Sequence, residues 1–103
     1  MDNLKIVYKI LVYIEKSMDC DEFDSTFFST LKISENRLNK ILKSMIDDGL
    51  ISGFNIIPMV GGFGIKPTDP SLTIKGMEYL QENSIMQKIK KEMKEIKDRV
   101  PFI

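Results

Sequence analysis

The chain has 103 residues, which suffices for one globular domain and is short for two. Hydrophobic residues make up 43% and charged residues 29%, a balance typical of a folded rather than a disordered protein. The single cysteine excludes a disulfide within the chain, and the absence of histidine excludes Cys/His zinc sites and histidine acid–base chemistry.

Charge is unevenly distributed, although the formal net charge is zero. Residues 1–84 carry 9 basic and 12 acidic side chains, whereas residues 85–103 carry 6 basic and 3 acidic ones. Nucleic-acid-binding domains usually show a basic surplus, because phosphate neutralisation supplies most of their non-specific affinity. The balance of the first 84 residues therefore argues against a nucleic-acid partner unless the cations gather in a local patch.

A membrane role is not expected. No stretch of the sequence reaches the roughly 18 apolar residues of a membrane span. The N-terminal stretch is interrupted by charges and lacks the small-residue cleavage site of a signal peptide. We therefore expect a cytoplasmic protein with no membrane partner.

The first predicted element is an amphipathic helix from about Asn3 to Met18. One apolar face consists of Leu4, Val7, Leu11, Ile14 and Met18. A second face, about 100° away, consists of Ile6, Ile10 and Tyr13. A helix that is apolar over more than half its circumference needs two partners. One is the core of its own domain, and the other is the C-terminal helix or a second subunit.

An acidic stretch, residues 19–24, is expected to form a solvated turn with Asp24 capping the next element. It departs from a calcium-binding loop, because Phe23 occupies the third ligand position and Thr30 stands where the loop requires glutamate. Residues 25–31 predict a short helix that supplies core residues, namely Phe27, Phe28 and Leu31.

The clearest helical pattern lies in residues 33–50. Apolar residues recur there at the spacing of a one-sided helix, at Leu38, Ile41, Leu42, Met45 and Ile46. We expect Ser34 to cap the helix start and Gly49 to end it in the left-handed conformation. The opposite side of this helix carries Asn36, Lys40, Lys43 and Asp47, flanked by Arg37 and Asn39.

Residues 50–66 predict a β-hairpin, since two apolar segments flank Gly61 and Gly62. Gly53 indicates a bulge and Pro58 an edge position. The glycines match neither a GxxxxGK[ST] phosphate loop nor a dinucleotide-binding loop. Residues 67–71 predict a connecting loop. A helix is then expected from Thr73, with Met77, Tyr79 and Leu80 facing inward and a break at 83–84.

A last helix is expected over residues 85–99, ended by Pro101. It carries a narrow apolar stripe, Ile85, Ile89, Met93, Ile96 and Val100. We predict that this stripe packs on the second face of the first helix, Ile6, Ile10 and Tyr13, within one chain or across a homodimer. The chain would then comprise a domain over residues 1–84 and an amphipathic C-terminal helix over residues 85–103.

The predicted order is helix, short helix, helix, β-hairpin, helix, helix. This is the plan of a winged helix-turn-helix, a mainly helical α+β fold with a β-hairpin wing and here an extra C-terminal helix. The segments NLKIVYKIL, EFD, IDDGLISG and LTIKGMEYLQENS together resemble the YjcQ family, small winged-helix proteins of Gram-positive bacteria and their prophages. The resemblance spans about residues 1–86 and implies the fold, but no established biochemical activity.

DNA binding is the first functional hypothesis. In helix-turn-helix proteins the N-terminal part of the second helix meets base edges in the major groove. The side chains expected at base edges are Asn36, Arg37, Asn39 and Lys40, and those expected near phosphate are Lys43 and Lys66. Asp47, Asp48 and the absence of arginine from the wing oppose this hypothesis. So few cations imply a homodimer on paired half-sites of double-stranded DNA.

A protein-interaction module on the same fold is the alternative hypothesis. It is supported by the zero net charge, the acidic turn and an apolar wing tip that includes Met59, Val60 and Phe63. An enzyme is not expected, because nothing pairs carboxylates with a nucleophile or a histidine. The acidic neighbours of Cys20 would not activate its thiol. No metal and no cofactor is expected.

Overall fold

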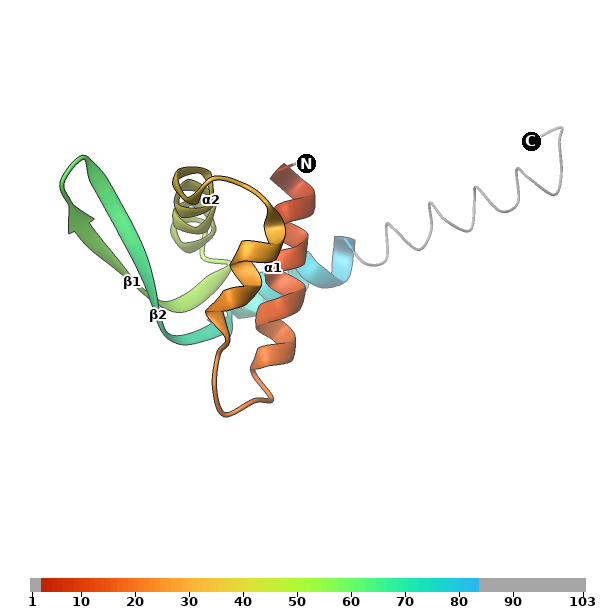
Figure 1. Ribbon diagram of the computed structural model, residues 1–103. Coiled ribbons are helices and arrows are strands. Elements are labelled where there is room, and N and C mark those ends of the chain that lie inside the picture. The colour runs from red at the N-terminus through yellow and green to blue at the C-terminus, as the bar shows by residue number, and fades with distance from the viewer. Residues whose placement is uncertain (1–2, 84–103) are drawn as a thin grey trace, which may run out of the picture.

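The computed structural model describes residues 3–83, which form an α+β fold (Figure 1). Helix α1 (Asn3–Ser17) is followed by a 3-10 helix, η1 (Ser25–Leu31), and by helix α2 (Glu35–Asp47). Strands β1 (Ile51–Met59) and β2 (Gly62–Leu72) pair antiparallel, and residues 74–83 are helical. Helices with a two-stranded hairpin in this order are compatible with a winged helix-turn-helix, so the predicted fold class is confirmed.

Helix α2 lies between α1 and the hairpin and contacts both (Figure 1). The core beneath it collects buried side chains from every element, namely Ile6, Ile10, Leu11, Ile14, Leu31, Leu42, Met45, Leu50, Ile51, Leu72 and Leu80. The hairpin meets this core through its base, where Ile51 and Leu72 are paired and buried. Its far end extends away from α1 (Figure 1).

The buried side of α1 differs from either predicted face. Leu4 is 65% exposed and Met18 is 43% exposed, although both were assigned to the main apolar face. The fully buried residues are Leu11 and Ile14 from the first predicted face and Ile6 and Ile10 from the second, so the core side of α1 combines parts of both faces. The periodicity identified a wide apolar arc correctly, but the part of the arc that becomes core depends on where η1, α2 and the hairpin pack.

The predicted ends of α2 are confirmed. The Ser34 hydroxyl accepts a hydrogen bond from the Arg37 backbone N–H at 3.1 Å, which satisfies a donor of the first turn. Gly49 adopts a φ of 75°, and the N–H groups of Gly49 and Leu50 donate to Ile46 and Met45 carbonyls at 3.0 and 2.9 Å. The chain thus leaves the helix directly into β1.

The acidic turn also behaves as predicted, with Asp24 capping η1. The Asp24 carboxylate accepts hydrogen bonds from the Thr26 hydroxyl at 2.6 Å and from the Thr26 backbone N–H at 3.0 Å. These two bonds favour the ionised form and hold the pKa of Asp24 below its ordinary value. The Tyr13 hydroxyl donates to the Asp24 carbonyl at 2.7 Å, while its ring stacks on Phe27 with centroids 4.1 Å apart. These contacts join η1 to α1.

The predicted loop over residues 67–71 is wrong, because β2 continues to Leu72. Pro67 pairs with Phe54 and Ser71 with Ser52, and the register shifts between these two pairs. Proline is tolerated here because each strand of a two-stranded ribbon has an outer edge where a missing N–H removes no ladder bond. The predicted bulge at Gly53 is confirmed, with a φ of 81°.

The 74–83 helix is anchored to the end of α2. The Gly76 N–H donates to the Thr73 hydroxyl at 3.0 Å, and that hydroxyl donates to the Gly49 carbonyl. A Cβ on Gly76 would lie 2.0 Å from the Leu50 carbonyl oxygen, so the helix backbone itself makes the close contact. Leu80 is buried as predicted and Tyr79 half-buried, but Met77 is 41% exposed, contrary to prediction. Gly76 takes the inward position instead. The predicted break at 83–84 and the 85–99 helix extend beyond the described residues.

Candidate nucleic-acid interface

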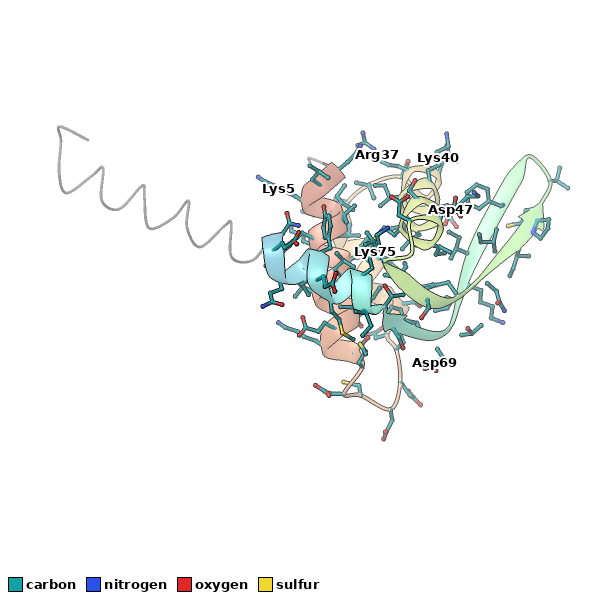
Figure 2. All side chains as sticks on the ribbon, turned by 180° about the vertical axis from the view of Figure 1, so that it is seen from behind. Lys5, Arg37, Lys40, Asp47, Asp69 and Lys75 are labelled. Atoms are coloured by element: carbon teal, nitrogen blue, oxygen red, sulfur yellow. The ribbon has the colours of Figure 1, made fainter. Side chains whose placement is uncertain are left out.

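The outer side of α2 forms a polar ridge. Asn36, Arg37 and Lys40 are exposed on the first two turns, while Leu42 and Met45 on the opposite side are buried in the core. Figure 2 shows Arg37 and Lys40 projecting from the same outer edge of α2. The structure therefore brings three of the predicted base-contacting residues together on the solvent side of the predicted helix.

A groove flanks this ridge on each side. The wing groove, about 480 Å³, lies between α2 and the hairpin end and is lined by Glu35, Asn36, Asn39, Lys40 and residues 59–63. The α1 groove, about 720 Å³, lies on the other side and is lined by residues of α1, α2 and the 74–83 helix. A protruding helix with open space on both sides has the shape required to enter a major groove, whose sugar–phosphate walls need room beside the helix.

Asn39 has a different setting from the three exposed ridge residues. It is half-buried on the wing side of α2, where its Nδ2 donates to the Phe63 carbonyl at 3.4 Å. This bond joins α2 to the far end of the hairpin, 24 residues along the chain. One amide hydrogen of Asn39 is therefore committed to positioning the wing.

Lys43 is neutralised within its own helix. Its Nζ lies 2.8 Å from the Asp47 carboxylate, one turn further along α2. Asp47 and Asp48 are both exposed at the end of the helix. Positive charge on α2 is consequently confined to its N-terminal half, where Arg37 and Lys40 lie and where the helix dipole is also positive.

Lys66 is exposed on β2, but it points away from α2. It pairs with Asn55, whereas the neighbouring Phe54 and Ile65 pack against the core. Successive side chains of a strand point to opposite faces, so Lys66 lies on the outer face of the wing. The structure therefore does not join Lys66 to Arg37 and Lys40 in one positive strip.

Sequence reasoning missed the contribution of α1 to this region. Lys5 is exposed on the first turn of α1 but projects away from α2 and its cations (Figure 2). Its neighbours Leu4 and Val7 line the α1 groove together with Ile41 of α2. These residues lie more than 30 positions apart in sequence, so no local pattern signals that they meet.

Two of the residues predicted to pack on the C-terminal helix are core residues. Ile6 and Ile10 are fully buried in the cluster that includes Leu31 and Leu42. Tyr13 is half-buried and contacts η1. The other residues of that prediction, Ile85, Ile89, Met93 and Ile96, lie outside the described residues, and the packing of the tail and the homodimer stay predictions.

Residues 3–83 show no feature of a metal site or of a membrane-spanning helix, and their one thiol is exposed. No group of three or more Cys, Asp and Glu residues in this part of the chain is placed to hold a metal ion. Cys20 is exposed in the acidic turn, where its Sγ contacts the Lys16 carbonyl at 3.9 Å. None of the helices in the described part has the length and apolar character to cross a membrane.

Comparison with known proteins bears on the whole described domain. The sequence profile of the YjcQ protein family matches residues 8–99, which include α2, the hairpin and the 74–83 helix. Curated proteins and solved structures give no match. The profile spans most of the chain and agrees with the resemblance found in its motifs, and the chain therefore belongs to the YjcQ family.

Proposed function

We propose that this protein is a winged-helix DNA-binding protein that acts as a small transcriptional regulator. The observation that carries the proposal is the ridge of α2, which presents Asn36, Arg37 and Lys40 to solvent between two grooves. The apolar side of α2 is fixed in the core, so the ridge is held rigidly. A rigid helix with exposed amide and guanidinium side chains on its first two turns is suited to base recognition.

The chemistry of the three ridge residues fits base edges. A guanidinium such as that of Arg37 donates two parallel hydrogen bonds to guanine O6 and N7, and an amide such as that of Asn36 pairs with adenine N6 and N7. Each such pair contributes roughly 1–3 kcal/mol of discrimination against a wrong base. Lys40 supplies a third donor, to guanine or to phosphate.

The small number of cations sets the expected binding mode. Arg37 and Lys40 are the exposed cations of the ridge, and Lys43 is paired with Asp47. Each neutralised phosphate contributes a slope of about −0.9 to the dependence of log affinity on log salt. We expect a slope of roughly −2 per subunit, with useful affinity requiring a homodimer on half-sites about 34 Å apart.

A titration of labelled random-sequence duplex at about 50 and 200 mM salt tests the proposal. The double variant Arg37→Ala/Lys40→Ala should weaken binding by about tenfold or more at low salt and flatten the salt slope by about 2 per subunit. The matched variant Lys9→Ala/Lys16→Ala removes two exposed cations from α1 and should change affinity less than about threefold. Equal losses in both variants, or no binding by the unaltered protein at either salt, would contradict the proposal.

A protein-interaction module is the second candidate, and one observation favours it. The outer half of the hairpin exposes large apolar side chains, namely Ile56 (40%), Ile57 (42%), Met59 (61%) and Val60 (108%). Exposed apolar groups gathered on one element are typical of protein contacts. For this candidate, replacing Ile57 and Met59 with serine should abolish partner capture, and Arg37→Ala/Lys40→Ala should leave it unchanged.

A further inference from the structure

The α1 groove has an apolar floor that the proposed DNA contacts do not use. Leu4 and Val7 come from α1, Ile41 and Met45 from α2, and Tyr79 from the 74–83 helix. Met45 is buried at the base, Val7, Ile41 and Tyr79 are half-buried, and Leu4 is 65% exposed at the rim. The exposure of the apolar side chains therefore increases from the base of the groove to its rim. Such a groove can receive apolar side chains of a ligand.

We propose that the α1 groove is the docking site for an acidic amphipathic helix of a partner protein. We infer that the ligand is acidic from the positive charge of the side chains around the groove. Arg37 and Lys40 of α2 line it. Within the described chain, Asp48 is the one aspartate or glutamate among its lining residues. Carboxylates flanking an apolar stripe would pair with these cations.

We infer that the ligand is a helix from the shape of the groove. Its walls are helices α1 and α2, and helical ligands anchor in such grooves through apolar side chains at i, i+3 or i+4 and i+7. A helix satisfies its own backbone hydrogen bonds, whereas an extended peptide would require a strand edge. The groove offers an apolar floor and no strand edge, because none of its lining residues within the described chain belongs to β1 or β2.

The charge of the chain's own C-terminal segment disfavours it as the occupant. Residues 85–103 carry 6 basic and 3 acidic side chains, the same sign as the rim of the groove. A separate acidic partner therefore fits better than the tail or the tail of a second copy. This segment nevertheless has an apolar stripe and is therefore tested as an alternative occupant of the groove.

Occupation of the groove has a regulatory consequence that rests on the proposed function. Arg37 and Lys40 line the α1 groove and are also proposed to contact DNA. Carboxylates of the partner and phosphates of DNA would compete for the same two cations. An acidic partner helix would therefore release the protein from DNA.

The probe is a fluorescein-labelled peptide of about 16 residues, roughly four helical turns, with leucine at i, i+3, i+4 and i+7 and glutamate at most other positions. Fluorescence anisotropy with the full chain compares it with a scrambled peptide of equal composition and with a version carrying lysine for glutamate. We expect the amphipathic acidic peptide to bind at least about tenfold more tightly than either control. Equal binding of the acidic and scrambled peptides would overturn the proposal.

Two matched variants locate the site. Leu4→Asp places a carboxylate on the groove rim, in the first turn of α1 where it favours the helix, and should weaken peptide binding about tenfold or more. Ile74→Asp alters a residue that is 71% exposed and does not line the groove, and should leave peptide binding unchanged. Equal effects of the two variants would overturn the assignment. A neutral variant, Leu4→Ser, removes apolar surface from the groove without adding charge and should also weaken peptide binding. Leu4→Ser and Ile74→Asp should both bind random duplex within about threefold of the unaltered protein, so failure of DNA binding and failure of peptide docking are separable.

A full-length Ile89→Asp/Met93→Asp variant tests the tail as occupant. Unchanged peptide affinity supports an open groove, whereas a several-fold increase would show that the tail fills it and would overturn the proposal. For the regulatory step, duplex should displace the labelled peptide from the unaltered protein. A peptide that binds with the expected sensitivity to Leu4→Asp but is not displaced by duplex would overturn the competition.

Discussion

Helix α2 and the hairpin wing are built in opposite ways. On α2 the apolar side chains are in the core and the exposed residues are polar or charged. On the outer half of the wing the exposed residues are apolar, including Ile57, Met59 and Val60. Both elements lie side by side, joined by the Asn39–Phe63 hydrogen bond.

This difference assigns separate tasks to the two elements. The side chains proposed to contact DNA, Asn36, Arg37 and Lys40, belong to α2, whereas Lys66 faces away on the wing. The wing therefore contributes shape and apolar surface rather than charge. For DNA binding, this implies that α2 carries nearly all the measurable affinity. For protein binding, it implies that the wing supplies a contact independent of α2.

The largest expected effect concerns how the wing is anchored, and it compares two glycines with the same φ angle. Gly53 and Gly61 both have a φ of 81°. A Cβ on Gly53 would lie 1.8 Å from the Asp69 carbonyl oxygen, whereas one on Gly61 meets nothing within 4 Å. Gly61→Ala should cost about 1–2 kcal/mol of unfolding free energy from the left-handed backbone alone. Gly53→Ala should cost several kcal/mol, roughly 3 or more, since the strand must also shift.

Urea denaturation of both variants measures this difference. If the wing were loosely attached, the bulge would open without affecting the core, and both variants would lose the same small amount. A large loss for Gly53→Ala alone would show that the base of the wing unfolds together with the domain. The apolar outer half of the wing is then held in a fixed position beside α2.

Local signals in the sequence were sufficient to predict where several helices begin or end and where the strand bulges. Ser34, Asp24 and Thr73 each accept a hydrogen bond from the first turn of the helix that follows, and Gly49 and Gly53 adopt positive φ. Each of these roles depends on a residue and its near neighbours. They were therefore predictable from residue type and spacing.

Choices made by tertiary packing were not predictable in the same way. Leu4, Met18 and Met77 fit helical apolar faces yet are exposed, because the surrounding elements cover other parts of those helices. The strand through Pro67 was missed because proline normally argues against a strand, and the exception depends on a two-stranded sheet. The α1 groove joins residues from three helices and has no local signature.

The next prediction tests whether the wing carries charge-independent affinity for DNA. Ile57→Ser/Met59→Ser removes two apolar side chains that are 42% and 61% exposed. Because neither side chain belongs to the buried core, the unfolding free energy should fall by only about 1 kcal/mol. Affinity for random duplex should change less than about threefold, far less than for Arg37→Ala/Lys40→Ala. A loss equal to that of the α2 variant would reverse the division of tasks between the two elements.

The smallest expected effect concerns η1, which leads into α2 and not into the wing. Hydrogen bonds from Thr26 lower the pKa of Asp24, so its contribution to stability is present above the unfolded-state pKa and is lost as pH falls through the folded-state value. Asp24→Asn keeps an acceptor for the Thr26 N–H but cannot titrate. Between about pH 5 and pH 2 the thermal midpoint of the unaltered protein should therefore fall slightly further than that of Asp24→Asn. Asp21→Asn, which removes an exposed carboxylate from the same turn without removing the cap, should follow the unaltered protein. If the thermal midpoint of Asp24→Asn fell with pH as far as that of the unaltered protein, the ionised Asp24 carboxylate would not stabilise η1.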